Sequence, residues 1–96
     1  MATPEGKVQK SIVDYGKSQG FWVLRFQVMQ MSGFPDLMFL GYGKVFFIEV
    51  KRKSDQKGPT GLQAKRIMQI NKYGVPAKWF GDLYDAKEFI DEFKPE

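Results

Sequence analysis

The 96-residue sequence contains no cysteine and no histidine. Without cysteine, disulfide bonds and thiolate zinc sites are excluded. Without histidine, the chain cannot form a Ser-His-Asp or Cys-His nucleophilic centre or a histidine zinc site, and it has no histidine general base. Any hydrolytic chemistry must therefore rest on carboxylates, lysines, tyrosines and a hard metal ion.

Long apolar runs and a secretion signal are also missing. No apolar stretch approaches the roughly 18 residues that a membrane helix needs, and the first ten residues, MATPEGKVQK, lack the apolar core of a signal peptide. The apolar fraction of 43% and the nine phenylalanines favour a compact fold. We therefore expect one domain, residues 1–96, that works in the cytoplasm.

Acidic residues are scarce in the first 81 positions, where thirteen lysines and arginines face five acids, a net charge of +8. Residues 82–96 carry six acids and two lysines, a net charge of −4. The positive charge of residues 1–81 suggests a polyanionic partner such as nucleic acid. A surface that is basic only for solubility would have the same composition. Two of the five acids, Asp36 and Glu49, stand in apolar stretches, where solubility does not explain a carboxylate.

Turn residues and apolar periodicity divide the chain into seven elements. The predicted elements, in chain order, are a helix opened by Thr3-Pro4 and closed by Gly20, strands at 21–28, 36–40 and 44–50, a helix at 60–73, a strand at 77–80 and a helix at 85–93 that begins with a capping box. The order α-β-β-β-α-β-α predicts an α/β fold with a mixed sheet and helices packed on its faces.

The apolar strand VFFIEVK, residues 45–51, is interrupted by Glu49 and Lys51. Side chains alternate along a strand, so these two share one face of the sheet. An ionised carboxylate there is costly unless it is paired or bound to a cation. Asp36 begins the neighbouring strand, so the two carboxylates can converge as an oxygen-ligand site suited to Mg²⁺ or Mn²⁺. The alternative is a Glu49–Lys51 ion pair on a half-exposed strand.

Pro35-Asp36 followed by Glu49-Val50-Lys51 resembles the PD-(D/E)XK signature of a superfamily of metal-dependent nucleases. The wider pattern adds an N-terminal helix with a glutamate, Gly-Phe before Pro35, and a later helix that opens with a glutamine. From about residue 5 to about residue 80 it is similar to the virus-type replication-repair nuclease (VRR-Nuc) domain, in the short standalone form found in phages. That resemblance implies a restriction-endonuclease-like PD-(D/E)XK core.

The resemblance also implies an activity and a site. It implies a Mg²⁺- or Mn²⁺-dependent endonuclease that hydrolyses DNA phosphodiesters, with Asp36, Glu49 and the carbonyl of Val50 as metal ligands. Lys51 would orient the attacking water or stabilise charge that develops on the phosphate. One metal ion or two remains open. Standalone members are homodimers built like Holliday-junction resolvases, so a homodimer that prefers branched DNA is expected.

Two outlying residues complete the expected site. Glu5 and Gln63 both extend the inward stripe of their helices, and the resemblance assigns Glu5 to metal binding and catalysis and Gln63 to catalysis. Each also has a purely structural explanation. Glu5 in a first helical turn complements the helix dipole, and Thr60-x-x-Gln63 fits a capping box.

The remaining basic and aromatic residues are assigned to DNA contact and to the core. Four cations are expected to contact phosphates, unless they only keep the surface soluble: Arg52, Lys53, Lys57 and Lys65. Six aromatic residues are assigned to the core rather than to base stacking: Phe21, Trp22, Phe39, Phe46, Phe47 and Trp79. The apolar residues of loop 29–34, Met29, Met31 and Phe34, suggest a dimer contact. The rival interpretations are a catalytically silent nucleic-acid-binding module, a structural protein, and a monomer that prefers flaps or single strands.

Overall fold

The computed structural model describes residues 4–25, 32–51 and 59–96, with side chains from residue 6 onward. The elements, in chain order, are α1 (Pro4–Ser18), β1 (Trp22–Arg25), β2 (Leu37–Gly41), β3 (Lys44–Val50), α2 (Gly61–Lys72), β4 (Ala77–Phe80) and α3 (Leu83–Asp91). The predicted order and the α/β fold class are confirmed. Within the described ranges, no helix combines the length and the apolar character that crossing a membrane requires.

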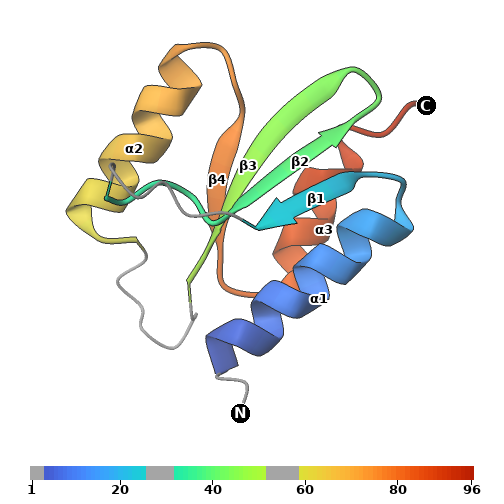
Figure 1. Ribbon diagram of the computed structural model, residues 1–96, viewed down its shortest axis with the longest axis horizontal. Coiled ribbons are helices and arrows are strands. Elements are labelled where there is room, and N and C mark those ends of the chain that lie inside the picture. Colours follow the sequence, from blue (N-terminus) through green and yellow to red (C-terminus); the bar gives the residue numbers. More distant parts are fainter. Residues whose placement is uncertain (1–3, 26–31, 52–58) are drawn as a thin grey trace.

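The four strands form one mixed sheet in the order β1-β2-β3-β4. The first three strands are antiparallel neighbours, and β4 returns parallel to β3 after the α2 crossover. Figure 1 shows α1 and α3 packed along one face of the sheet, while α2 stands apart beside β4. The face that α1 and α3 cover is called the inner face below, and the opposite one the outer face.

The hydrophobic core lies between the inner face and the helices α1 and α3. Phe46 lies at its centre: it is fully buried and stacks on Phe39, with a centroid distance of 4.7 Å, and on Phe93, at 4.1 Å. Gly16 lets α1 approach this cluster, because a Cβ there would stand 2.6 Å from the Phe39 ring. A hydrogen bond of 2.6 Å from the Tyr15 hydroxyl to Asp91 joins α1 to α3 outside the core.

The tight turn between β2 and β3 fixes the register of these two strands. Tyr42 and Gly43 take positive φ angles of 54° and 74°, as a two-residue turn between twisted strands requires. Tyr42 is an uncommon residue for that conformation. Its hydroxyl donates to the Gln19 carbonyl at 2.7 Å and its ring packs edge-on against Phe21, contacts that offset the backbone strain.

Helix α2 is held differently from α1 and α3. None of its residues, all of which the structure describes, is fully buried. It is attached to the edge strand by Asn71, whose side-chain amide exchanges two hydrogen bonds with the backbone of Ala77, of 2.8 and 3.3 Å. Arg66 donates from Nε to the carbonyl of Ser32 at 3.1 Å, so α2 also holds the turn that leads into Asp36.

Two predictions about the fold are wrong. The last helix begins at Leu83, not at Asp85, because the side chain of Asp82 caps it by accepting from the Asp85 N–H at 2.9 Å. Trp22, Phe47 and Trp79 are not core residues. Trp22 and Trp79 are 65% and 40% exposed, because both project from edge strands, and Phe47 is only partly buried because it lies on the outer face of β3.

Candidate active site

The sheet register brings Asp36 and Glu49 together. Leu37 on β2 pairs with Ile48 on β3, so the next step of the antiparallel register sets Asp36 opposite Glu49. Counted from the tight turn, this is a pair without mutual backbone hydrogen bonds, the type in which facing residues lie closest, with Cα atoms about 4.5 Å apart. Ile48 and Val50 face the core, so both carboxylates lie on the outer face.

Glu49 is a buried ionisable residue, with only 2% of it exposed. Burial is the main reason that its pKa rises from 4.5 to about 9, and the adjacent carboxyl of Asp36 adds to the rise. The ammonium of Lys51 and the backbone N–H of Asp36 act in the opposite direction. Oε1 of Glu49 finds no hydrogen-bond donor among the described residues. A buried oxygen without a donor is energetically unfavourable, unless a cation fills the position.

Pro35 affects the third expected ligand, the carbonyl of Val50. One further step of the register sets Pro35 opposite Val50, at a position where the two residues would exchange backbone hydrogen bonds. Proline has no N–H, so it offers no donor to the Val50 carbonyl. The proline of the Pro-Asp pair therefore leaves a carbonyl oxygen near the two carboxylates.

The other predicted catalytic residues differ in how far the structure places them. Lys51 follows β3 and is fixed by its backbone, which donates to the Phe80 carbonyl at 2.9 Å. Gln63 lies at the start of α2 in the predicted capping box, where its Oε1 accepts from the Thr60 N–H at 2.8 Å. Glu5 lies in the first turn of α1, and its side chain is outside the described part of the structure.

The predicted DNA-contacting residues fall on two segments. Arg52, Lys53 and Lys57 lie outside the described residues. Lys65 is exposed on α2, where it lines a shallow groove of about 560 Å³ together with Arg66, Met68, Gln69 and Lys72. Three cations line this groove, and through Arg66 it adjoins the turn before Asp36.

The dimer contact expected in loop 29–34 is described only in part. Met29 and Met31 lie outside the described residues. Phe34 packs edge-on against Phe47 at a centroid distance of 5.5 Å, so it belongs to the outer face beside the carboxylate pair.

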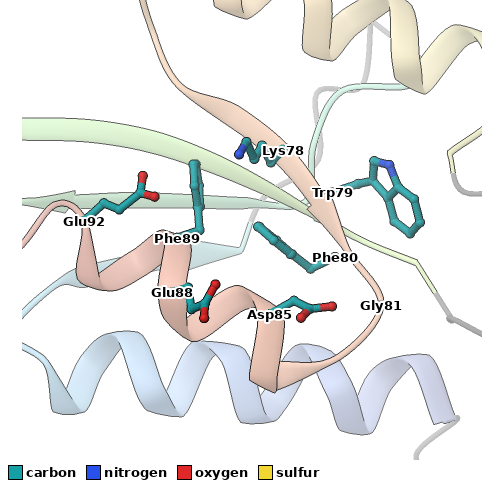
Figure 2. A pocket seen from close by; sticks show the side chains of 8 residues that line it. All are labelled: Lys78, Trp79, Phe80, Gly81, Asp85, Glu88, Phe89 and Glu92. Carbon is teal, nitrogen blue, oxygen red and sulfur yellow. The ribbon is translucent and has the colours of Figure 1, made fainter.

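A second cavity, of about 460 Å³, lies between β4 and α3. Figure 2 shows that its helical wall carries Asp85, Glu88 and Glu92. Three carboxylates repel a phosphate. The cavity is lined by Phe80 and Phe89 on the α3 side of β4, and Trp79 borders it with its indole turned away from both rings. The cavity is therefore not part of the site at Asp36 and Glu49.

The carboxylate pair fits a hard divalent cation. Oxygen ligands suit Mg²⁺ or Mn²⁺, and the Oε1 atom of Glu49 without a donor marks where such a cation would be stabilised. In the part of the chain that the structure describes, no group of three or more Asp, Glu, His or Cys residues is arranged so that it could hold a metal ion. A site built from that part has two carboxylates and a backbone carbonyl.

The prediction from sequence missed two residues near the carboxylate pair. Arg66 gave no signal beyond its charge, because its contact with Ser32 spans 34 positions of the chain. Trp79 was assigned to the core because aromatic residues are more often core residues than stacking platforms for bases. Its exposure follows from the position of β4 at the sheet edge, which the sequence does not reveal.

The mixed sheet and its covering helices define an α/β domain whose outer face carries the paired carboxylates. The sequence matches no family model and no curated protein. A solved structure named "VRR_NUC domain" superposes on the chain with a TM-score of 0.84 and 28% sequence identity, over 96% of this chain and 99% of that chain. In fold and in extent, the chain is therefore similar to a VRR-Nuc domain, which is a nuclease domain.

Proposed function

We propose that this protein is a Mg²⁺- or Mn²⁺-dependent endonuclease that hydrolyses phosphodiester bonds of DNA. The observation that carries the proposal is the buried Glu49 carboxyl. It lies opposite Asp36 in a fold similar to a VRR-Nuc domain, and one of its oxygens has no donor among the described residues. A chain that needed only stability would place an apolar residue there. The alternative, a catalytically silent nucleic-acid-binding module, gives this unfavourable pair of carboxyls no role, so it does not explain why the chain retains them.

Asp36, Glu49 and the Val50 carbonyl hold the cation in this proposal, with Glu5 as a further ligand. Such a cation stabilises charge on the scissile phosphate and activates water as the nucleophile. Lys51, on the same face as Glu49, orients that water and stabilises the charge that develops on the phosphate oxygens. Gln63 completes the catalytic set at the start of α2.

DNA binds mainly through its phosphates in this proposal. The groove on α2 offers Lys65, Arg66 and Lys72, and Arg52, Lys53 and Lys57 supply further charge just after the catalytic strand. These contacts carry no sequence information, so they position the DNA without selecting a sequence.

The protein acts as a cytoplasmic homodimer in this proposal, in the host cytoplasm if a phage encodes it, and prefers branched DNA such as a four-way junction. The outer face supports a contact between two copies, because Trp22, Leu40 and Val45 form one row across β1, β2 and β3 and Trp22 is 65% exposed. A two-fold dimer would present two sites to two strands of a junction.

The nuclease is tested with labelled four-way junctions and matched linear duplexes, each incubated with Mg²⁺, Mn²⁺ or EDTA. We expect cleavage with either cation, junctions before duplexes, and none in EDTA. Asp36→Ala should lower the rate at least about a hundredfold while DNA binding survives, because the basic surface is intact. Undiminished cleavage by purified Asp36→Ala would refute the site. Junction binding without cleavage by the wild type would favour the silent module.

The dimer is tested by light scattering at the concentrations used for cleavage. We expect twice the monomer mass for the wild type and the monomer mass for Trp22→Glu, because a charge in an apolar contact is strongly unfavourable. Lys17→Glu, a change of charge on α1, is the matched control and should remain dimeric. A wild type of monomer mass that cuts junction and duplex equally well would refute the dimer and leave the nuclease standing.

A further inference from the structure

Trp79 is an exposed aromatic residue directly beside the candidate active site. In the parallel register it is the partner of Glu49, and neighbouring strands run about 4.8 Å apart. Its neighbour Phe80 turns to the inner face, where it contacts Phe89 at a centroid distance of 5.4 Å. Figure 2 shows the indole of Trp79 turned away from both rings. Trp79 therefore shares the outer face with Glu49.

The fold does not need this indole for its core. The core cluster is built from other residues, while Trp79 is 40% exposed. A single exposed apolar side chain is common on a protein surface, so it is the place of Trp79 beside Glu49 that distinguishes it from the other exposed apolar residues. An aromatic ring beside a site for phosphate chemistry has a chemical use, because the flat face of any nucleobase can stack on it.

The position of β4 adds a second argument. The strand β4 lies between β3, which carries Glu49, and α2, which carries the basic groove. A DNA strand with phosphates on Lys65 and Lys72 and its scissile phosphate at Glu49 crosses β4. Trp79 is the aromatic residue of β4 that faces outward at this crossing.

We propose that Trp79 is a stacking platform for an unpaired base next to the phosphate that is cut. This inference rests on the proposed nuclease function, which fixes where that phosphate lies. Inside a duplex both faces of a base are already stacked, so a base must leave the helix to reach the indole. Unstacking is least costly at mismatches, branch points and single strands. Trp79 thus selects DNA with a nucleotide that is free to unstack.

Trp22 provides a matched control within the same face. It lies in the row of Val45, four positions along β3 from Glu49 and so about 13 Å away along the strand. It also lies on β1, at the opposite edge of the sheet from β4. Trp22 and Trp79 are the only two tryptophans of the sequence. Trp22→Phe and Trp79→Phe each leave one indole as a fluorescent reporter.

The two single-tryptophan proteins are titrated in EDTA, where no cleavage is expected, with a single-stranded oligonucleotide and with a blunt hairpin duplex of equal phosphate number. The hairpin is closed by a non-nucleotide linker, so it has no unpaired base. Anisotropy of the same DNAs carrying a dye confirms saturation independently. We expect the single strand to quench Trp79 strongly and the hairpin to quench it little, with Trp22 unchanged by both. Unchanged Trp79 emission at saturation, or equal quenching by the hairpin, would overturn the proposal.

Affinity provides a second measurement. Trp79→Ala should weaken single-strand binding about tenfold and leave hairpin binding unchanged, and Trp79→Phe should restore most of the loss. Equal weakening toward both DNAs would show that Trp79 is only structural. Both measurements are made without cleavage, so they test stacking on Trp79 independently of the nuclease activity. Failure of the nuclease proposal would appear instead as no cleavage by the wild type in Mn²⁺.

Discussion

The two faces of the seven-residue strand β3 have opposite effects on stability. Phe46, Ile48 and Val50 are fully buried among apolar neighbours on the inner face. Glu49 on the outer face is just as buried, yet its carboxyl raises the free energy of the folded state whenever it is ionised. The inner face therefore stabilises the fold, and the outer face uses part of that stability to hold an unfavourable group in place.

The largest expected effect is a difference in the free energy of unfolding between substitutions at two adjacent phenylalanines, one on each face. Phe46→Ala should lower the free energy of unfolding by about 3–5 kcal/mol, because Phe46 is fully buried and stacked on two rings. Phe47→Ala should lower it by about 1 kcal/mol, because Phe47 is only partly buried and contacts Phe34 edge-on. Urea denaturation followed by circular dichroism measures both.

A loss so large can prevent Phe46→Ala from folding at all. Phe46→Leu and Phe47→Leu then make the same comparison with smaller changes. Equal losses at the two positions would show that the outer face packs as tightly as the inner face.

The next effect has the opposite sign and depends on pH. Glu49→Gln should stabilise the protein in EDTA, because it removes a carboxyl whose pKa burial raises to about 9. Below pH 4.5 the carboxyl is protonated in both the folded and the unfolded state. As the pH rises from 4.5 toward 9, the unfolded chain loses its proton first, so wild-type stability falls. At pH 9 the variant should be more stable by at least about 2 kcal/mol.

Thermal melts of both proteins at pH 5 and pH 9 measure this difference. The two should nearly coincide at pH 5 and separate at pH 9. Mn²⁺ should then stabilise the wild type and not the variant, because the cation binds the folded wild type through Glu49. If Glu49→Gln were less stable at pH 9 in EDTA, the carboxylate would be stabilising, and the contrast between the faces would be wrong.

Elements with a local sequence pattern could be predicted from the sequence. The exposure of a side chain could not be predicted where it depends on the position of its strand in the sheet. Strands 44–50 and 77–80 were predicted with the bounds that the structure has, because turn residues flank both. The adjacency of Asp36 and Glu49 was predictable because a short connection keeps the two strands of a hairpin side by side. The exposure of Trp79 was not, since it depends on which strand forms the sheet edge. Nor was the cap at Asp82, because Asp85, three positions later, offers an equally good capping signal.

The smallest expected effect separates the two explanations of Gln63. Thr60→Ala and Gln63→Ala remove the same capping box from its two ends, so each should lower stability by about 1 kcal/mol. The box uses only the oxygen of the Gln63 amide. If Gln63 also serves catalysis, as the VRR-Nuc resemblance implies, the nitrogen of its side-chain amide is the group that the cap does not use, and Gln63→Ala alone should lower turnover as well. We expect that additional loss, measured as junction cleavage in Mn²⁺ at a temperature where both variants are fully folded. Equal turnover in the two variants would confine Gln63 to the cap, and α2 would then serve the outer face only through its cations and its hold on the turn before Asp36.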